Sequence, residues 1–384
     1  MAIVFRGSLN TSFIVLRVGK LFAKLRKRLK NLFEKEDHPI SRNNTSEDIY
    51  TTLTVMKPLT FSILRLLSDG EFHSGVILAQ RLNVSRASIS NALRDLEAVG
   101  VAMHTVHGRG YRLSDPVHWL ERDTILKYLG EEARNFHLEI LDTAESTSSL
   151  LLQKAAMALN SGNAGIHVIA AELQTRGRGR RGRQWHSGLG DGLTFSLLWR
   201  FQQGASFLSG LSLAVGVAIV RALRSVGIKD AVLKWPNDVM VSFCKLAGTL
   251  IELQGDMFGP TVAVIGVGMN LKLPESIQAR IDQGATDVFT ITGEMPDRNE
   301  LLAVLLIELT TMLREFEYRG FAPFQKEWVD HHVCENKPVI LSLPDGSSQE
   351  GVVHGIAADG SLLLQTTAGI HGYSSGEITL CRMV

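Results

Sequence analysis

"TRGRGRRGRQW", Thr175 to Trp185, packs five arginines and three glycines into eleven positions. Gly177, Gly179 and Gly182 satisfy G-x-G-x-x-G, but a dinucleotide-binding turn requires a helix to open at the third glycine. Residues 184–192 are instead rich in glycine and serine and have no helical period. A Walker loop is excluded as well, because no Lys-Ser or Lys-Thr follows a glycine. Two hypotheses remain: a cationic flap that folds over a small phosphorylated ligand, or an RGG-like nucleic-acid segment.

The charge of the whole chain is almost balanced. Its 384 residues are long enough for two or three domains, and 40 Lys plus Arg face 39 Asp plus Glu, a net charge of +1. Residues 1–40 alone carry a net +6, which leaves the rest of the chain at −5. The arginine segment is therefore a positive island in a mildly acidic body.

Residues 1–55 form a basic extension of uncertain status. Over Phe13 to Phe33, apolar residues recur on one helical stripe with lysines and arginines around it, a pattern that fits binding to anionic lipid or to DNA. Two simpler alternatives are a true start at Met56 and a weakly ordered extension. The longest apolar stretch, Leu211 to Val220, is too short to cross a bilayer, so no membrane partner is expected.

The three cysteines, Cys244, Cys334 and Cys381, are far apart and form no C-x-x-C. This argues against a disulfide scaffold or a zinc site and fits a reducing cytosol. The histidines form no H-E-x-x-H motif. We therefore predict a cytoplasmic protein without a metal site of its own.

Residues 56–114 have the pattern of a winged helix-turn-helix domain. The short turn Asn83-Val84-Ser85 joins two predicted helices, and "VAMHTVHGRGYRL" adds a hairpin wing with Arg109 at its tip. The alternative is a small domain that packs or dimerises without binding DNA. The helices are predicted over residues 59–68, 74–82 and 85–100. The predicted DNA-binding residues are Ser85, Arg86, Asn91, Arg94 and Arg109.

The rest of the chain predicts an α+β fold with two further domains. Residues 120–333 alternate strand and helix, which indicates a mixed sheet with helices on one side. Residues 335–384 contain short strands between turns, which predicts a small five-stranded barrel. The central strands are expected over 137–142, 167–172, 193–199, 232–235, 239–243, 248–254 and 262–269. The central helices are expected over 147–159, 208–226 and 299–317.

"LKWPND", Leu233 to Asp238, is the second informative stretch. Lys234 closes an apolar strand just before Trp-Pro, and a buried lysine needs an anion, although its stem could also reach solvent at the strand end. Asn237 and Asp238 also suit a plain turn. Gly266 and Gly268, inside the strand "VIGVGMN", indicate a bulge or the close approach of a ligand or a neighbouring strand.

Taken together, these segments resemble the bifunctional biotin–protein ligase and biotin-operon repressor of bacteria. "SRASISNALRDL" and "GRGYRL" resemble its winged helix-turn-helix. "AELQTRGRGRRGRQW", "KWPND", "KLAGTLIEL" and "IGVGMN" resemble its ligase core, and "GEITL" its C-terminal, SH3-like barrel. The similarity runs from about Met56 to Leu380.

The resemblance implies two activities. Biotin and ATP, with Mg²⁺, give biotinyl-adenylate, and the acyl group then moves to a lysine of a carboxylase's biotin carboxyl carrier domain. The adenylate-bound homodimer represses the biotin operon by binding operator DNA. The implied catalytic residues are Lys234 and Arg180. The implied biotin-binding residues are Ser146, Thr147, Ser148, Gln174, Arg178, Gly179, Arg180, Lys234, Gly266 and Gly268. The implied ATP- and adenylate-binding residues are Arg178, Arg180, Arg183, Trp185, Asn237 and Asn270.

Four positions depart from the family's pattern: Ser148, Gln184, Tyr373 and Cys381, where the family has asparagine, often lysine, tryptophan and arginine. They put nucleotide affinity in doubt more than the reaction. Two rival functions stand beside this one. A lipoate or octanoyl ligase has the same catalytic fold, and a sensory repressor would bind biotin without catalysis.

Overall fold

The computed structural model describes residues 56–94, 96, 101–158 and 165–381. The predicted amphipathic stripe at 13–33 and the predicted helix end at Gly100 lie outside these residues. Among them, no helix is long and apolar enough to cross a membrane.

The first described part is a three-helix unit with a two-stranded hairpin, as the sequence predicted. Ser74 and Ser85 cap the second and third helices, because each side chain accepts a hydrogen bond from a backbone N–H of the first turn. Apolar side chains such as Ile63, Leu78 and Ile89 form its core. The elements are α3 (Pro58–Leu67), α4 (Gly75–Arg81), α5 (Arg86–Leu93), β1 (Met103–Val106) and β2 (Gly110–Leu113).

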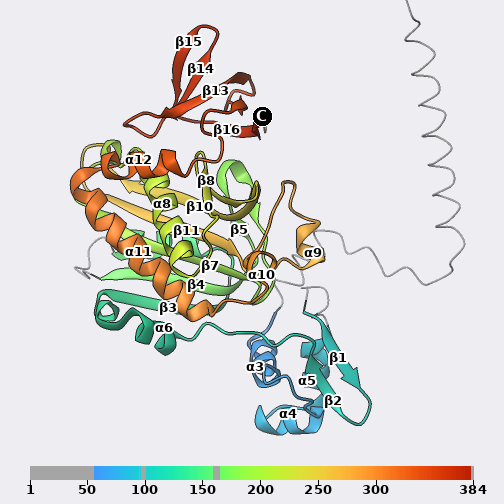
Figure 1. Ribbon diagram of the computed structural model, residues 1–384. Helices are drawn as coiled ribbons and strands as arrows, with labels where there is room; N and C mark the ends of the chain where they lie inside the picture. The colour runs from blue at the N-terminus through green and yellow to red at the C-terminus, as the bar shows by residue number, and fades with distance from the viewer. Residues whose placement is uncertain (1–55, 95, 97–100, 159–164, 382–384) are drawn as a thin grey trace, which may run out of the picture. The chain divides into compact units, whose positions relative to one another are not determined.

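A seven-stranded mixed sheet forms the centre of the next part (Figure 1), as predicted. Its order is β3-β4-β7-β11-β10-β9-β8; β3 and β4 pair in parallel, and all the other neighbours pair antiparallel. The strands are β3 (Phe136–Ala144), β4 (Ile166–Gln174), β7 (Gly192–Phe201), β8 (Val232–Lys234), β9 (Asp238–Val241), β10 (Cys244–Gly255) and β11 (Thr261–Asn270).

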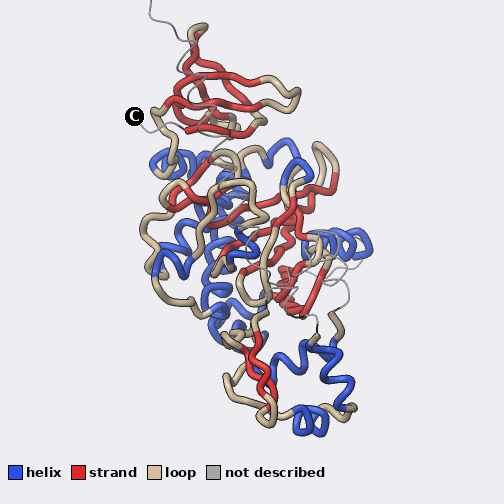
Figure 2. Tube along the Cα trace, turned by 90° about the vertical axis from the view of Figure 1, so that its right-hand side faces the viewer, coloured by secondary structure: helices blue, strands red, loops and turns tan. Residues whose placement is uncertain are grey.

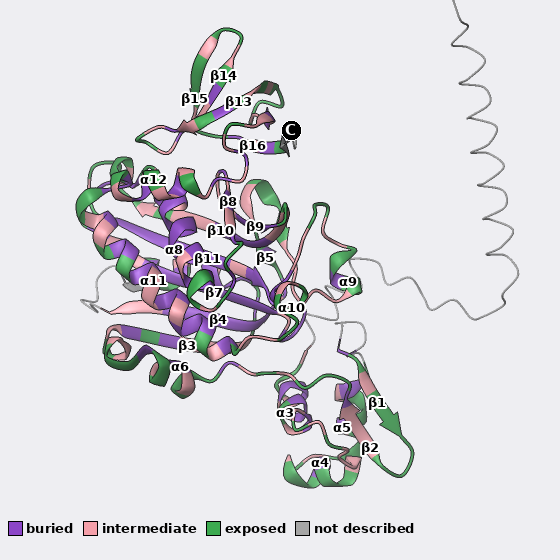
Figure 3. Cartoon of the chain, in the orientation of Figure 1, coloured by how far each residue is buried: buried purple, intermediate pink, exposed green. Residues whose placement is uncertain are grey.

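Helices cover both faces of this sheet, so the prediction of helices on one side is wrong. α8 (Leu211–Ser225) and α11 (Arg298–Arg319) share one large core with Val168 and Ile265. α7 (Thr147–Ala158) packs against Ile169 and its neighbours on the opposite face, since successive side chains of a strand point to opposite sides. Periodicity shows that a helix is amphipathic but not which face of a sheet it covers. Figure 3 shows how much of α8 is buried.

Shorter helices connect these layers: α6 (Arg122–Leu129), α9 (Glu275–Gln278), α10 (Val288–Thr292) and α12 (Ala322–Asp330). The C-terminal part is a five-stranded antiparallel sheet, seen in red in Figure 2. Its order, β15-β14-β13-β12-β16, has the predicted number of strands and leaves β15 and β16 as its two ends. The strands are β12 (Pro338–Ser342), β13 (Ser348–Ile356), β14 (Leu362–Thr366), β15 (Gly369–Tyr373) and β16 (Glu377–Cys381).

One cysteine prediction is wrong. Cys244 is free, but Cys334 is disulfide-bonded. Separation along the chain does not limit separation in the fold, so the spacing of the cysteines was a weak guide. The cysteine content therefore no longer supports a reducing compartment.

Candidate functional site

A cavity of about 580 Å³ gathers all fourteen residues for which the sequence predicted contacts to biotin or the adenylate. They come from the start of α7, the end of β4, the arginine segment, the β8–β9 turn and β11. These residues are Ser146, Thr147, Ser148, Gln174, Arg178, Gly179, Arg180, Arg183, Trp185, Lys234, Asn237, Gly266, Gly268 and Asn270.

The arginine segment is a hairpin. β5 (Gly177–Arg178) pairs antiparallel with β6 (Gln184–Trp185), and the Gly179 N–H donates to the Arg183 carbonyl oxygen over 2.8 Å. The tip is a single 3₁₀ turn, and Arg181 takes a left-handed conformation there with φ of 54°. No helix opens at Gly182, so the dinucleotide-binding turn is excluded on structural grounds too.

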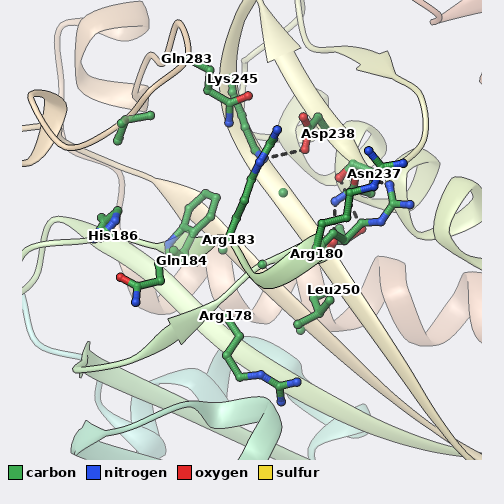
Figure 4. A pocket seen from close by; sticks show the side chains of 18 of the residues that line it. Arg178, Arg180, Arg183, Gln184, His186, Asn237, Asp238, Lys245, Leu250 and Gln283 are labelled. Atoms are coloured by element: carbon green, nitrogen blue, oxygen red, sulfur yellow. Dashed lines mark hydrogen bonds and ion pairs between the residues drawn. The ribbon is translucent and has the colours of Figure 1, made fainter. Parts of the chain in front are cut away.

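The arginines of this hairpin have different partners (Figure 4). Arg178 forms two hydrogen bonds, of 2.6 and 3.1 Å, with the Glu252 carboxylate and points away from Asn237. Arg183 forms an ion pair of 2.5 Å with Glu377, in the C-terminal sheet. Arg180 donates to Asn237 Oδ1 over 3.2 Å and forms none of the ion pairs found among the described residues. Arg180 is therefore the guanidinium best placed to receive an anion in the cavity.

Burial removes water from the cations of the cavity and so disfavours their charged forms. It lowers the pKa of the Lys234 ammonium, against the opposing influence of Asp238 and Glu377. It also lowers the pKa of Arg180, which the neighbouring Arg181 lowers further. Both shifts mean that the charged form lacks solvation, so an incoming anion gains more from these groups than from cations in water.

Sequence reasoning missed a second lysine in the cavity. Lys245 Nζ lies 2.7 Å from Asp238 Oδ1, and both side chains are largely buried. Asp238 also stands opposite Lys234 in the backbone register of the β8–β9 ladder, and its negative charge opposes the lowering of the Lys234 pKa. The signal was present in "KLAGTLIEL", where Lys245 interrupts an apolar strand just as Lys234 does.

Two glycines form the floor on which the indole of Trp185 lies. Gly248 and Gly268 stand directly opposite each other on β10 and β11. A Cβ at Gly268 would come within 2.4 Å of Trp185 Cε2, and one at Gly248 within 3.0 Å of Lys245 Nζ. The Lys245 ammonium in turn lies 5.7 Å from the centroid of the Trp185 ring. The free side of Gly268 is therefore occupied by the protein's own indole.

A group of hydroxyls and one amide forms the opposite end of the cavity. Gln174 Oε1 accepts from the Thr147 backbone N–H over 2.8 Å, and Thr147 Oγ1 lies 2.7 Å from Ser196 Oγ. Ser148 Oγ, 2.9 Å from Ser196 Oγ, fills the space above Gly266, where a Cβ would approach it to 2.5 Å. Ser196 was not predicted. These groups offer both donors and acceptors to a buried polar ring.

A further part of the cavity lining comes from the segment that follows β11. Asn270 Nδ2 donates to the carbonyl oxygens of Lys245 and Thr286 and so holds residues 280–285 against the cavity. His186 lines the same region, and its pKa is lowered first by burial and then by Arg280. A neutral imidazole can donate and accept one hydrogen bond each. No motif pointed to His186 or to this part of the lining.

The five predicted DNA-binding residues lie elsewhere, on α5 and the β1–β2 hairpin, and all are exposed. Ser85 is the cap of α5, and Arg94 donates to Asn91 Oδ1 over 2.6 Å. The Arg109 guanidinium does not project freely from the hairpin tip; it lies 4.3 Å from the centroid of the Phe72 ring.

Comparisons with known sequences match three segments of the chain. The Biotin/lipoate A/B protein ligase family matches residues 144–270. An HTH domain matches residues 60–112, and the Biotin protein ligase C terminal domain matches residues 336–380.

Individual proteins and solved structures are similar to longer parts of the chain. The bifunctional ligase/repressor BirA of Salmonella typhimurium is 37% identical over 84% of this chain and 97% of its own length. A biotin protein ligase of Aquifex aeolicus in complex with biotin and ATP is 29% identical, with a TM-score of 0.52, over 63% of this chain and 97% of that one. A mutant of that enzyme, in complex with biotin, has a TM-score of 0.53 and 29% identity over 64% and 98% of the two chains.

Proposed function

The chain belongs to the family of the bifunctional ligase/repressor BirA proteins, and from this we propose that it activates biotin with ATP and transfers it to a carrier lysine. One observation carries the proposal. Three partly buried cations, Lys234, Lys245 and Arg180, and a separate group of hydroxyl and amide groups line one cavity. Such a site suits a ligand with a polar ring at one end and a carboxylate at the other.

The first step joins two anions. A carboxylate oxygen of biotin forms a bond to the α-phosphorus of ATP while the bond from that phosphorus to pyrophosphate breaks. Like-charge repulsion is a large part of the barrier, and fixed cations in a water-poor site reduce it most. We assign that role to Lys234, Lys245 and Arg180.

The second step frees AMP. The amine of the carrier lysine attacks the acyl carbon, the bond to the phosphate oxygen breaks, and the nitrogen loses a proton. The same cations then face the departing phosphate. No side-chain nucleophile is needed, so the chain's contribution is placement and charge.

We assign the two ends of the ligand to the two ends of the cavity. The ureido ring of biotin fits the group formed by Thr147, Ser148 and Gln174, because a buried ring urea needs both donors and acceptors. The nucleotide fits the side of Trp185 and Asn270. The arginine hairpin, held by Glu252 and Glu377, covers the mixed anhydride and shields it from water.

Mg²⁺ fits this cavity as a companion of the nucleotide. No group of three or more His, Cys, Asp or Glu side chains among the described residues could hold a metal. Magnesium in nucleotide sites is bound through substrate phosphates plus one or two carboxylates. Asp238, Asp282 and Glu377 are carboxylates that line the cavity, and one or two of them would hold the ion beside the phosphates, where it would supply further positive charge.

The winged helix-turn-helix domain supports a second role, repression by binding operator DNA. Arg86 and Asn91 on α5 and Arg94 directly after it are all exposed, as a recognition helix requires. We place both roles in the cytoplasm, where ATP, the carboxylase carrier and the operon occur together.

We propose that the adenylate-bound protein forms a homodimer through an exposed apolar patch at one end of the central sheet. The patch consists of Phe258, Met257 and Phe207, with 86%, 65% and 37% of their surface exposed. The backbone of Ser206 donates to the Met257 carbonyl oxygen, so the three residues belong to one surface. Exposed apolar side chains that lie together in this way are candidates for an interaction site.

Sedimentation of the protein with biotin and ATP tests this surface. Phe258→Asp should leave a monomer where the unmodified protein dimerises, and Ile370→Asp, a substitution at another exposed apolar residue, should not. Equal dimerisation of both variants would place the interface elsewhere.

The ligase activity has one decisive assay. Purified protein, ATP, biotin and a carboxylase carrier domain should give a carrier whose mass rises by one biotinyl group. Lipoate and octanoate, tested in parallel, should give no adduct. Transfer of lipoate or octanoate would favour the lipoate ligase, and operator binding without any transfer would favour the sensory repressor.

A further inference from the structure

Three side chains of the central part hold the segment that joins it to the DNA-binding domain. Glu172 Oε1 accepts from the Leu120 N–H over 2.6 Å, and Arg298 Nη1 donates to the His118 carbonyl oxygen over 2.6 Å. Asn299 donates to the Trp119 carbonyl oxygen over 3.1 Å and accepts from the Glu121 N–H over 2.7 Å. Four consecutive residues, 118–121, are thus held by their backbone. We call Glu172, Arg298 and Asn299 the linker clamp.

The clamp contains a fully buried ion pair. Arg298 Nη1 lies 2.7 Å from Glu172 Oε2, and neither side chain has any exposed surface. Arg298 is also the first residue of α11, where the helix dipole disfavours a cation. Pairs of this kind contribute little net stability, because burial removes the solvation of both charges. Stability alone does not account for the clamp.

The buried ion pair contacts two strands that border the cavity, β4 through Glu172 and β7 through the Gly192 carbonyl oxygen. Glu172 and Gln174 are two positions apart on β4, and the chain continues from there into the arginine hairpin at Gly177. Arg298 Nη2 also donates to the carbonyl oxygen of Gly192, over 3.0 Å. Gly192 pairs across the sheet with Asn270, which lines the cavity. One buried pair therefore touches both the linker and the ends of two cavity strands.

We propose that the linker clamp couples occupancy of the cavity to the order of the linker, and through it to the DNA-binding domain. The proposal rests on the function proposed above. A ligand that orders the arginine hairpin also steadies the end of β4, and the Glu172 carboxylate then holds Leu120 more firmly. Glu172, Arg298 and Asn299 act here as positioning residues, since none of them lines the cavity.

Hydrogen exchange of the Leu120 and Glu121 amides in the full chain tests the coupling directly. Adding biotin and ATP should slow exchange at both amides at least about fivefold, the lower end of typical allosteric couplings. Glu172→Gln should abolish this ligand-dependent difference at Leu120. Asn299→Ala should abolish it at Glu121, and since Asn299 is only half-buried, this variant keeps the test valid if Glu172→Gln fails to fold.

A matched control separates coupling from general loosening. Glu327→Gln removes a bidentate partner of Arg221, in a pair between α12 and α8, and should leave the linker response unchanged. A clamp that only adds stability would change exchange equally with and without ligand. A ligand response in Asn299→Ala and Glu172→Gln equal to that of the unmodified protein overturns the proposal.

Formation of biotinyl-adenylate and pyrophosphate in the same samples distinguishes a failure of the coupling from a failure of the proposed function. If the unmodified protein makes no adenylate from biotin and ATP, the proposed function fails. If it makes adenylate while the linker amides do not respond, the coupling fails and the ligase activity stands.

Discussion

Two short hairpins of this chain share the tripeptide Gly-Arg-Gly and differ in their surroundings. The wing contains Gly108-Arg109-Gly110, and the cavity hairpin contains Gly177-Arg178-Gly179. In the wing, the guanidinium groups of Arg109 and Arg112 lie 4.3 and 4.8 Å from the ring of Phe72. In the cavity hairpin, Arg178 and Arg183 are paired with carboxylates, and Arg180 is half-buried.

The difference shows that neighbours, and not the Gly-Arg pattern, decide what such a hairpin binds. Exposed guanidinium groups over an aromatic ring keep a long-range, salt-sensitive attraction that suits a phosphate backbone. A half-buried guanidinium beside two lysines suits one small anion, which it neutralises at short range. These surroundings favour a flap over a small ligand, the first of the two hypotheses that the sequence left open.

The largest expected effect concerns Lys245, which lies beside Trp185 of the cavity hairpin. Lys245→Met removes a buried cation and should slow adenylate formation by about 10²–10³-fold, the range for a lost electrostatic stabiliser. Release of pyrophosphate, followed with biotin and ATP in excess, measures it. Lys326→Met, at an exposed lysine paired with Asp330, is the control and should have no effect. A Lys245→Met variant that releases pyrophosphate at the rate of the unmodified protein would show that Lys245 does not assist adenylate formation.

Arg180→Gly tests the flap. The adenylate should still form, although more slowly, because Lys234 and Lys245 remain. It should then escape, because the group that holds its phosphate is gone. Biotinylation of bystander lysines should rise about tenfold, which corresponds to the loss of one charge-assisted hydrogen bond.

Arg181→Gly is the matched control for the flap. Arg181 is exposed, and its φ of 54° suits glycine. The Arg181→Gly variant should biotinylate bystander lysines to the same extent as the unmodified protein. Undiminished selectivity for the carrier in Arg180→Gly would show that the hairpin does not retain the adenylate.

The smallest effect belongs to the wing. Arg109→Ala should weaken binding to every duplex alike and lower the slope of log affinity against log salt by about one, as expected for one phosphate contact. Ligase activity should not change. Phe72→Ala frees the guanidinium but keeps its charge, so the salt slope should persist. A loss that depends on sequence would instead make Arg109 a reader of bases.

Most helices and strands could be predicted from the sequence, because they depend on local patterns of residues. Capping serines, apolar periodicity and turn residues located the winged domain and most central strands. The side of the sheet that α7 covers was not readable, because it depends on tertiary packing. The disulfide at Cys334 was missed for the same reason, since spacing along the chain was taken as spacing in the fold.

The site was predicted in part. The motifs "GRGRRG" and "KWPND" pointed to residues that do meet in one cavity. They could not tell which arginine faces the ligand, because that depends on where Glu252 and Glu377 lie. They also gave no reason to combine Lys245 with Asp238, which the β9–β10 ladder brings together.

The central claim is that fixed cations bring two negatively charged reactants together. Exchange of labelled pyrophosphate into ATP, with biotin present, measures the first step alone. Lys234→Met should lower this exchange rate by about 10²–10³-fold at saturating substrates. A rate equal to that of the unmodified protein would contradict the account.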